Sequence, residues 1–225
     1  MRSPSLSGML VGIAVSASAP AQSNISLIDK FCWSENAGFI NWRDANAGMN
    51  GVLVVRESGF LQGFAWCENA GYLNMGSGAG PYANSMGNDF GVNLDLETGE
   101  LSGFAWSENA GWVNFAGGSA ASPPNPARLD FAAGRFRGYA WSENTGWLNL
   151  DDANVFVGVN CPADFNSDWM VDDSDFVIFA SAYNILDCLD PSMPSGCPAD
   201  LNGDGFIEDS DFVVFAAAYN RLLCP

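Results

Sequence analysis

Two spacings of apolar residues divide the chain into a long β-type part and a short helical part. Before residue 160, aromatic residues alternate with small or polar ones, as in Phe-Ala-Trp at 104–106 and Tyr-Ala-Trp at 139–141. Such alternation places every second side chain on one face of a β-strand. After residue 172 the apolar residues recur every three or four positions, as Phe176, Phe179 and Tyr183 do, which predicts helices with one apolar face.

The β-type part contains four copies of the motif Trp-x-Glu-Asn-x-Gly-aromatic. The copies begin at Trp33, Trp66, Trp106 and Trp141, at spacings of 33, 40 and 35 residues. Periods of this length are typical of chains built from repeated supersecondary units. Asn-x-Gly suits a type I turn followed by glycine in the left-handed region, so each copy predicts a tight hairpin.

An earlier glycine marks a second hairpin in the last three copies. Gly59, Gly99 and Gly134 each precede the motif tryptophan by seven residues and follow a short apolar segment. A repeat therefore predicts three antiparallel strands joined by two glycine turns. Four such repeats predict a mainly β domain of about a dozen strands over residues 22–160.

The strands at the two ends of the repeat array indicate whether the sheet is closed. The first copy has little room for its opening strand, whereas residues 155–159 follow the fourth copy like an opening strand with nothing after it. If this segment completes the first repeat, the sheet loses its edges. A small four-bladed propeller and a barrel are two such closures, and an open meander is the alternative.

The C-terminal part carries two copies of a twelve-residue pattern of oxygen-bearing residues. Ligand candidates fall at positions 1, 3, 5, 7, 9 and 12, the spacing of an EF-hand loop, with a backbone carbonyl serving at position 7. Gly205 at position 6 suits the sharp turn around the ion. The sequence therefore predicts two Ca²⁺ sites. Their ligands are Asp164, Asn166, Asp168, Met170, Asp172 and Asp175 in the first loop, and Asp200, Asn202, Asp204, Phe206, Glu208 and Asp211 in the second.

The segments after the two loops are nearly the same, Asp-Phe-Val-Ile-Phe-Ala-Ser-Ala-Tyr-Asn and Asp-Phe-Val-Val-Phe-Ala-Ala-Ala-Tyr-Asn. With Asp at position 12 and no entering helix, residues 161–225 resemble a dockerin, the paired calcium loop–helix module that binds cohesin domains in cellulosomes. The resemblance implies a small α domain and a cohesin-like or cell-surface protein as partner. The Trp-Ser-Glu-Asn-x-Gly-Trp repeat resembles uncharacterised exported bacterial proteins, which implies no function.

Three features depart from the dockerin pattern. Trp169 occupies position 6 of the first loop, and because a residue with a Cβ resists the left-handed conformation, we expect weaker Ca²⁺ binding there. Asp-Ser at 173–174 and at 209–210 replaces the Ser/Thr pairs that dockerins often use for recognition. The basic residues that follow the loops in cellulosomal dockerins are also missing.

Four of the six cysteines follow the duplication of the tail. Cys161 and Cys197 precede a loop by three residues, and Cys188 and Cys224 each come 27 residues later. Pairing within a copy would span a loop and a helix about 15 Å long, against Cα separations of roughly 4.4–6.8 Å in disulfides. The pairs Cys161–Cys224 and Cys188–Cys197 are therefore favoured.

Other features indicate export. Residues 1–21 have the basic residue, the short apolar stretch and the Ala-Pro-Ala site of a signal peptide, and the apolar stretch is shorter than the ~20 apolar residues of a spanning helix. Six cysteines fit an oxidising compartment. Cys32 and Cys67 flank equivalent tryptophans, which makes a bond between neighbouring copies plausible. We expect a secreted protein, or one at the extracellular surface, with no membrane span.

Charge and composition limit the classes of function that the protein can have. Eight basic residues, 26 acidic residues and no His give a formal net charge of −18, which argues against nucleic acid as a partner and suits cation binding. No Ser/His/Asp or Cys/His set is present. A carboxylate pair for glycoside hydrolysis needs two different environments, whereas repeated motifs supply equal ones. A non-enzymatic protein is expected.

Two functions remain open. In the first, the calcium-binding tail attaches the β domain to an extracellular partner, while the motif tryptophans are core and the Glu and Asn residues cap hairpins. In the second, exposed rings stack on sugars of a polysaccharide, and several weak sites gain by avidity. Exposure of Trp112 and Trp147, or of Trp106 and Trp141, is what the second function requires.

Overall fold

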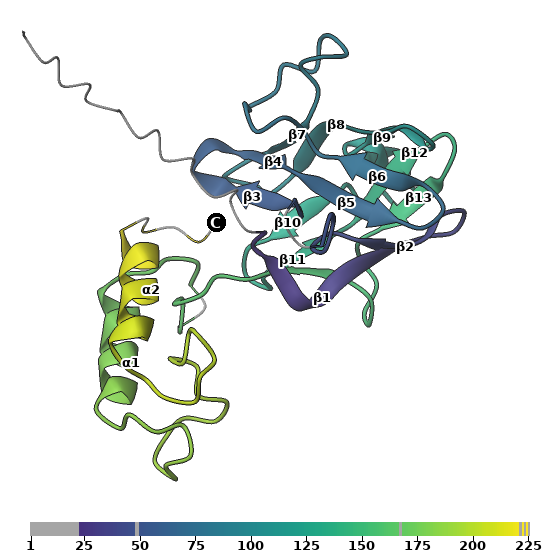
Figure 1. Ribbon diagram of the computed structural model, residues 1–225. Helices are drawn as coiled ribbons and strands as arrows, with labels where there is room; N and C mark the ends of the chain where they lie inside the picture. The colour runs from purple at the N-terminus through teal and green to yellow at the C-terminus, as the bar shows by residue number, and fades with distance from the viewer. Residues whose placement is uncertain (1–22, 48–49, 167, 221, 223, 225) are drawn as a thin grey trace, which may run out of the picture.

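The computed structural model describes residues 23–225 apart from 48–49, 167, 221, 223 and 225. The predicted signal peptide at residues 1–21 lies outside the described residues. A body of β-strands is followed by two helices, α1 (Asp173–Tyr183) and α2 (Asp209–Tyr219), which lie side by side (Figure 1). Neither they nor any other described helix is long and apolar enough to cross a bilayer.

Eight antiparallel strands close into a barrel. Each strand pairs with the next, and the last pairs with the first through Trp33–Asn149 and Ser34–Leu148. The ring therefore has no free edge. A barrel is one of the two closures predicted from the repeats, and the open meander is wrong. In order around the ring the strands are β1 (Ile25–Ser34), β2 (Gly38–Asn41), β5 (Phe64–Cys67), β6 (Gly71–Asn74), β8 (Leu101–Ser107), β9 (Gly111–Asn114), β12 (Tyr139–Ser142) and β13 (Gly146–Asn149).

Six outer strands extend the sheet beyond the barrel. β3, β4 and β7 continue from the first half of β8, and β10, β11 and β14 continue from the first half of β1. Val159 of β14 pairs with Ile25, so the segment at 155–159 does supply the strand that the first copy lacks. The outer strands are β3 (Leu53–Val55), β4 (Phe60–Gln62), β7 (Val92–Leu94), β10 (Arg128–Asp130), β11 (Arg135–Arg137) and β14 (Val157–Val159), with short 3₁₀ turns at Arg56–Ser58 and Gly117–Ala120.

Glycines bend the chain where the outer strands meet the barrel. Gly103 lies within β8 at φ +84°, and a Cβ there would be 2.3 Å from the carbonyl oxygen of Gly91. Gly63 and Gly138 take the same conformation and the same close approach to a backbone oxygen. At these two positions the bend separates β4 from β5 and β11 from β12. The predicted single middle strand of a repeat is therefore split in two of the copies.

The inside of the barrel is filled by the small residues of the motif. Ala65, Ala105 and Ala140 are fully buried, and so is Cys32 at the equivalent position. The aromatic residues on either side of them point outward because side chains alternate along a strand. The expectation that the motif tryptophans form the core is therefore wrong for Trp33, Trp66, Trp112 and Trp141, which are 38%, 40%, 42% and 38% exposed.

A ring of hydrogen bonds joins the four hairpins inside the barrel. The second motif residue of each copy is a buried Ser or Cys, and its side chain donates to the backbone carbonyl of the fifth motif residue in a neighbouring hairpin. Since the first hairpin donates to the fourth, the ring is closed and each buried carbonyl has a partner. The bonds run from Ser34 to Thr145 (2.7 Å), Cys67 to Ala37 (3.1 Å), Ser107 to Ala70 (2.7 Å) and Ser142 to Ala110 (3.1 Å).

Cys32 and Cys67 are free, so the disulfide expected between them is wrong. Ile40 pairs with both residues, one on each side, which places the two cysteines two strands apart. At about 4.8 Å per strand this separation exceeds the reach of a disulfide. The Cys67 thiol instead replaces the serine hydroxyl in the hydrogen-bonded ring, while burial raises the pKa of Cys32 to about 12.

The two disulfides of the tail are those favoured from the sequence. Cys161–Cys224 and Cys188–Cys197 have Cα separations of 5.2 and 5.4 Å. Between the helices, the rings of Phe179 and Phe215 are almost fully buried and stack with centroids 5.1 Å apart. The apolar faces predicted after the two loops therefore bury each other.

We expect the substitution Ser107→Ala to lower the free energy of unfolding by about 1–3 kcal/mol, because it leaves the buried Ala70 carbonyl without its donor. Ser102→Ala on the exposed face of the same strand is the matched control and should stay within about 0.5 kcal/mol of the parent. Urea unfolding measures both. Equal stability of the two variants would contradict a structural role for the ring.

Candidate metal centre

The aspartate at position 12 closes each loop onto its own beginning. In the first loop Asp175 is fully buried. Its Oδ1 accepts the backbone N–H groups of Phe165 (2.6 Å) and Asn166 (3.2 Å), and its Oδ2 accepts that of Asp172 (3.1 Å). Asp175 lies in the first turn of α1 and completes a capping box there. One carboxylate thus ties the start of the loop to the start of the helix.

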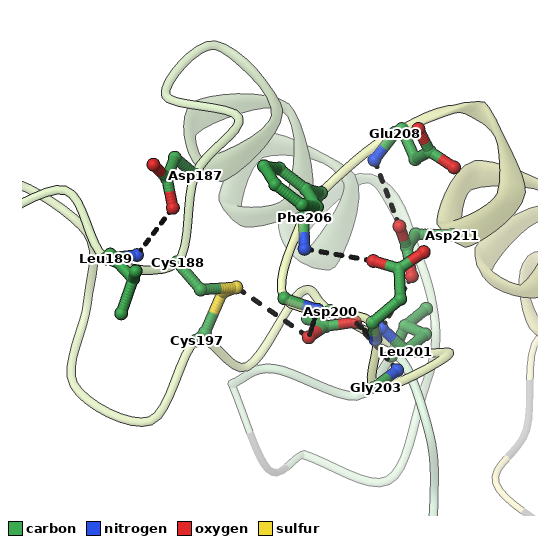
Figure 2. The surroundings of a disulfide bond; sticks show 12 residues. Asp187, Cys188, Leu189, Cys197, Asp200, Leu201, Gly203, Phe206, Glu208 and Asp211 are labelled. Carbon is green, nitrogen blue, oxygen red and sulfur yellow. Dashed lines mark hydrogen bonds between the residues drawn. A yellow bond between two sulfur atoms is a disulfide. The ribbon is translucent and has the colours of Figure 1, made fainter.

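The second loop repeats this arrangement (Figure 2). Asp211 is fully buried, and it accepts the N–H groups of Leu201 (2.8 Å), Asn202 (3.0 Å) and Glu208 (3.0 Å). Every contact of Asp175 therefore has its counterpart 36 residues later. The duplication that the sequence shows is also a duplication of local geometry.

The residues at positions 1, 3 and 5 shape the loop between these ends. Asp164 accepts from the N–H of Trp169 (2.9 Å), and Asp200 accepts from that of Gly205 (2.9 Å). Asn166 accepts from the N–H of Asp168 (2.9 Å), and Asn202 does the same for Asp204 (2.8 Å). These Asx-type contacts curl the backbone and gather oxygen atoms toward the inside of each loop.

The remaining candidate ligands lie at the loop exits. Met170 and Phe206 at position 7 have exposed side chains, so they can offer the backbone carbonyl expected of them and nothing else. At position 9, Asp172 caps α1 by accepting the N–H of Ser174 (2.8 Å), and Glu208 accepts the hydroxyl of Ser210 (3.1 Å). All twelve predicted residues thus fall on the two loops, in the order that the motif requires.

The donor set of the first loop suits a hard divalent cation. One carboxylate oxygen each from Asp164, Asp168 and Asp175 lies within 4.8 Å of the others. Residues 161–225 contain twelve acidic residues and a single basic one, Arg221, and no Lys or Arg of the described residues forms a salt bridge with the buried Asp175. Carboxylates gathered in one loop repel one another when all are ionised, and oxygen ligands are what Ca²⁺ prefers.

Two other groups of nearby ligand atoms carry no metal chemistry. Asp164 lies near Cys161 and Cys224, and Asp200 lies near Cys188 and Cys197. The sulfurs of both groups are disulfide-bonded, whereas a metal ligand must be a thiolate. Figure 2 shows Asp200 beside the Cys188 sulfur, 3.7 Å away. Each disulfide therefore supports the first residue of a loop instead of binding an ion.

Trp169 holds the strained position of the first loop. Its φ is +67°, in the left-handed region that Gly205 occupies at +92° in the second loop. The ring is 6% exposed and packs edge-on against Phe131 of the β part, with centroids 5.9 Å apart. The guanidinium of Arg56 lies over both rings and donates to the Trp169 carbonyl (2.9 Å). Burial of this large ring offsets a strain of about 1–2 kcal/mol.

Sequence reasoning misses this contact and predicts only weaker Ca²⁺ binding at Trp169. The signal that could have found it is the choice of residue. A residue that merely damaged the turn would not need to be tryptophan, whereas a large aromatic residue at a strained position indicates a packing role.

Two reciprocal hydrogen bonds connect each loop to the end of the other helix. The Tyr183 hydroxyl donates to Asp209, and the Tyr219 hydroxyl donates to Asp173, both at 2.6 Å. Each carboxylate holds the tyrosine proton and so raises the pKa of its partner above the ordinary value of about 10. The aspartates of both Asp-Ser pairs, which replace dockerin recognition residues, are therefore engaged within the tail.

No family model, curated protein or solved structure matches this chain. Function is therefore inferred from the site itself.

The tyrosine pair predicts a pH dependence of stability. The pKa of each tyrosine hydroxyl is higher in the folded state than in the unfolded state. The stability that the two hydrogen bonds contribute is therefore fully present below pH ~10 and is lost as the pH rises through the folded-state pKa. The double variant Tyr183→Phe/Tyr219→Phe should unfold at lower urea concentration than the parent at pH 8, and the difference should shrink as the pH rises above ~10. Tyr72→Phe on the barrel surface serves as control. A difference that stays constant with pH would contradict this role.

Proposed function

We propose that residues 161–225 are a calcium-binding, dockerin-like module that attaches the β-barrel to another extracellular component. The observation that carries the proposal is the buried aspartate at position 12 of both loops, which joins the loop start to the helix start in the same way twice. Bound Ca²⁺ would neutralise the clustered carboxylates and fix the loops, and with them the direction of both helices.

The outer surface of the helices supports a protein partner. Val177 and Val213 are 64% and 67% exposed, and Phe176 and Phe212 are both 44% exposed. The two pairs occupy equivalent positions in α1 and α2, so the duplication presents two similar apolar surfaces. Contiguous exposed apolar residues on a small module mark an interaction site. The proposed role is binding without catalysis.

A second function, polysaccharide binding by the barrel, is supported by the outward aromatic residues. Trp112 and Trp141 are exposed, whereas Trp106 and Trp147 are half-buried. Neither pair named as the requirement for sugar stacking is open as a pair; each contributes one exposed ring, so the requirement is met only in part. In this function the calcium module stabilises the protein, and attachment is to a polysaccharide.

Calcium binding is tested by calorimetric titration of the full oxidised chain. We expect two ions per molecule, with the loop of Trp169 the weaker site, and a rise in melting temperature with Ca²⁺. Asp175→Asn and Asp211→Asn should each remove one ion. Trp169→Gly should tighten the first site by roughly 5–30-fold through relief of about 1–2 kcal/mol of strain.

Arg56→Gln provides the matched control for Trp169→Gly. It removes the charge that contacts the Trp169 ring and carbonyl but leaves the loop sequence unchanged, so the calcium affinity should stay within about threefold of the parent. If the titration of the parent protein gave no heat of binding and Ca²⁺ left its melting temperature unchanged, the calcium sites would be refuted.

Attachment is tested by retention of an extracellular protein fraction on the immobilised chain, with and without a calcium chelator. Val177→Asp combined with Val213→Asp should abolish retention, because a charge in an apolar interface is left unpaired. Leu189→Asp, at an 89% exposed residue away from the helix surface, should have no effect. Retention that survives chelation or the double substitution would exclude the proposed surface.

A further inference from the structure

Each barrel hairpin carries three aromatic rings on its outer face. Two come from the first strand and one from the return strand, as Phe31, Trp33 and Phe39 do in the first hairpin. Phe39 packs edge-on against Trp33 with centroids 4.8 Å apart and contacts Phe31 at 6.1 Å. The tryptophan and return-strand ring of the other hairpins are paired at 4.6–4.7 Å. Mutual packing holds these rings in fixed orientations while leaving surfaces open.

A groove of about 650 Å³ separates the first hairpin from the second. Its walls are the rings of Trp33 and Phe39 on one side and Trp66 on the other. Asn41, Glu68 and Asn69 add polar groups to the same groove. The strand register explains this composition, because Asn41 pairs directly with Trp66 and brings the two hairpins side by side.

An equivalent groove of about 450 Å³ lies on the other side of the first hairpin. Here Trp147 and Asn149 of the fourth hairpin face Trp33 and Glu35 of the first, and Ser122 and Pro123 close one end. The register is again responsible, since Asn149 pairs with Trp33. Trp33 therefore lines both grooves and forms the ridge between them.

The chemistry of the two grooves fits a neutral sugar chain. Aromatic rings offer apolar faces for the C–H faces of sugars, and the exposed carboxylates of Glu35 and Glu68 accept hydrogen bonds from hydroxyl groups. Both volumes lie in the range of about 300–1,000 Å³ typical of ligand sites. Neither lining contains Lys or Arg, and the protein carries a net charge of −18, so anionic glycans are disfavoured.

We propose that the two grooves form one extended site for a neutral polysaccharide, whose chain crosses Trp33 and occupies a groove on either side. This inference rests on the second function proposed above and locates its site. Two adjacent grooves of the same composition suit a polymer of like sugar units. When one unit binds in the first groove, the effective concentration of its neighbours at the second groove rises.

The test is affinity electrophoresis of the full chain in gels containing hydroxyethyl cellulose, galactomannan or polygalacturonate. At least one neutral polymer should retard the protein, polygalacturonate should not, and a calcium chelator should leave the retardation in place. Trp33→Ala should weaken binding by about tenfold or more, because it removes a wall from both grooves. Trp106→Ala, the same position in the third hairpin, lines neither groove and should change binding less than about threefold.

The possible results of this experiment test polysaccharide binding and the location of its site separately. If neutral polymers retard the parent but Trp33→Ala binds as well as Trp106→Ala does, polysaccharide binding stands and the site is wrong. If no neutral polymer retards the parent, or polygalacturonate alone does, both are wrong. Because Trp33→Ala and Trp106→Ala each remove the tryptophan of an equivalent ring pair, the two variants should melt at similar temperatures. Self-association of the parent that Trp33→Ala abolishes, with no retardation by any polymer, would instead assign the grooves to a second copy.

Discussion

The ring of four hydrogen bonds inside the barrel is the interaction on which the rest of the β part depends. A second motif residue whose side chain donates to the backbone carbonyl of the fifth motif residue in the preceding hairpin must face inward, and this fixes the direction of every neighbouring residue along the strand. A barrel of eight strands has room inside for small and medium side chains only. Alanine or cysteine on the first strand of each hairpin and Ile, Leu or Val on the return strand therefore occupy the interior, and the aromatic residues on either side are directed to the surface.

The same constraint explains why the surface of the barrel is chemically unusual. Aromatic residues normally stabilise a protein by burial, yet here they gain most of their packing from one another across each hairpin. The rings are held in place without being covered. Rigid and uncovered rings with polar neighbours are an arrangement from which a binding surface can be built, and the proposed polysaccharide site rests on it.

Trp169 connects the two parts of the molecule. Its backbone belongs to a loop of the tail, whereas its ring belongs to a packed cluster with Phe131 and Arg56 of the β part. One continuous cluster of buried residues runs from the barrel to the helices as a result. A change in the conformation of the first loop therefore acts directly on the contact between the tail and the barrel.

Much of this fold could be predicted from the sequence because it depends on local patterns. The hairpins follow from Asn-x-Gly turns, the helices from their apolar spacing, and the tail disulfides from the distance that a loop and helix span. The buried face of each strand could not be predicted, because an alternating pattern is compatible with burial of either the aromatic or the small residues. The contacts of Cys32, Cys67 and Trp169 depend on residues distant in sequence, which no local pattern records.

The strand that completes the barrel's first repeat has a consequence for folding during synthesis. Ile25 pairs with Val159, and Trp33 pairs with Asn149, so the closing contacts join opposite ends of the β part. Contacts of such large sequence separation form slowly, because the chain between them must first be ordered. Until β13 and β14 have been made, β1 has no partner along the edge that they will occupy, although β2 already pairs with its other side. A partly synthesised chain would thus expose an unpaired strand edge that favours aggregation.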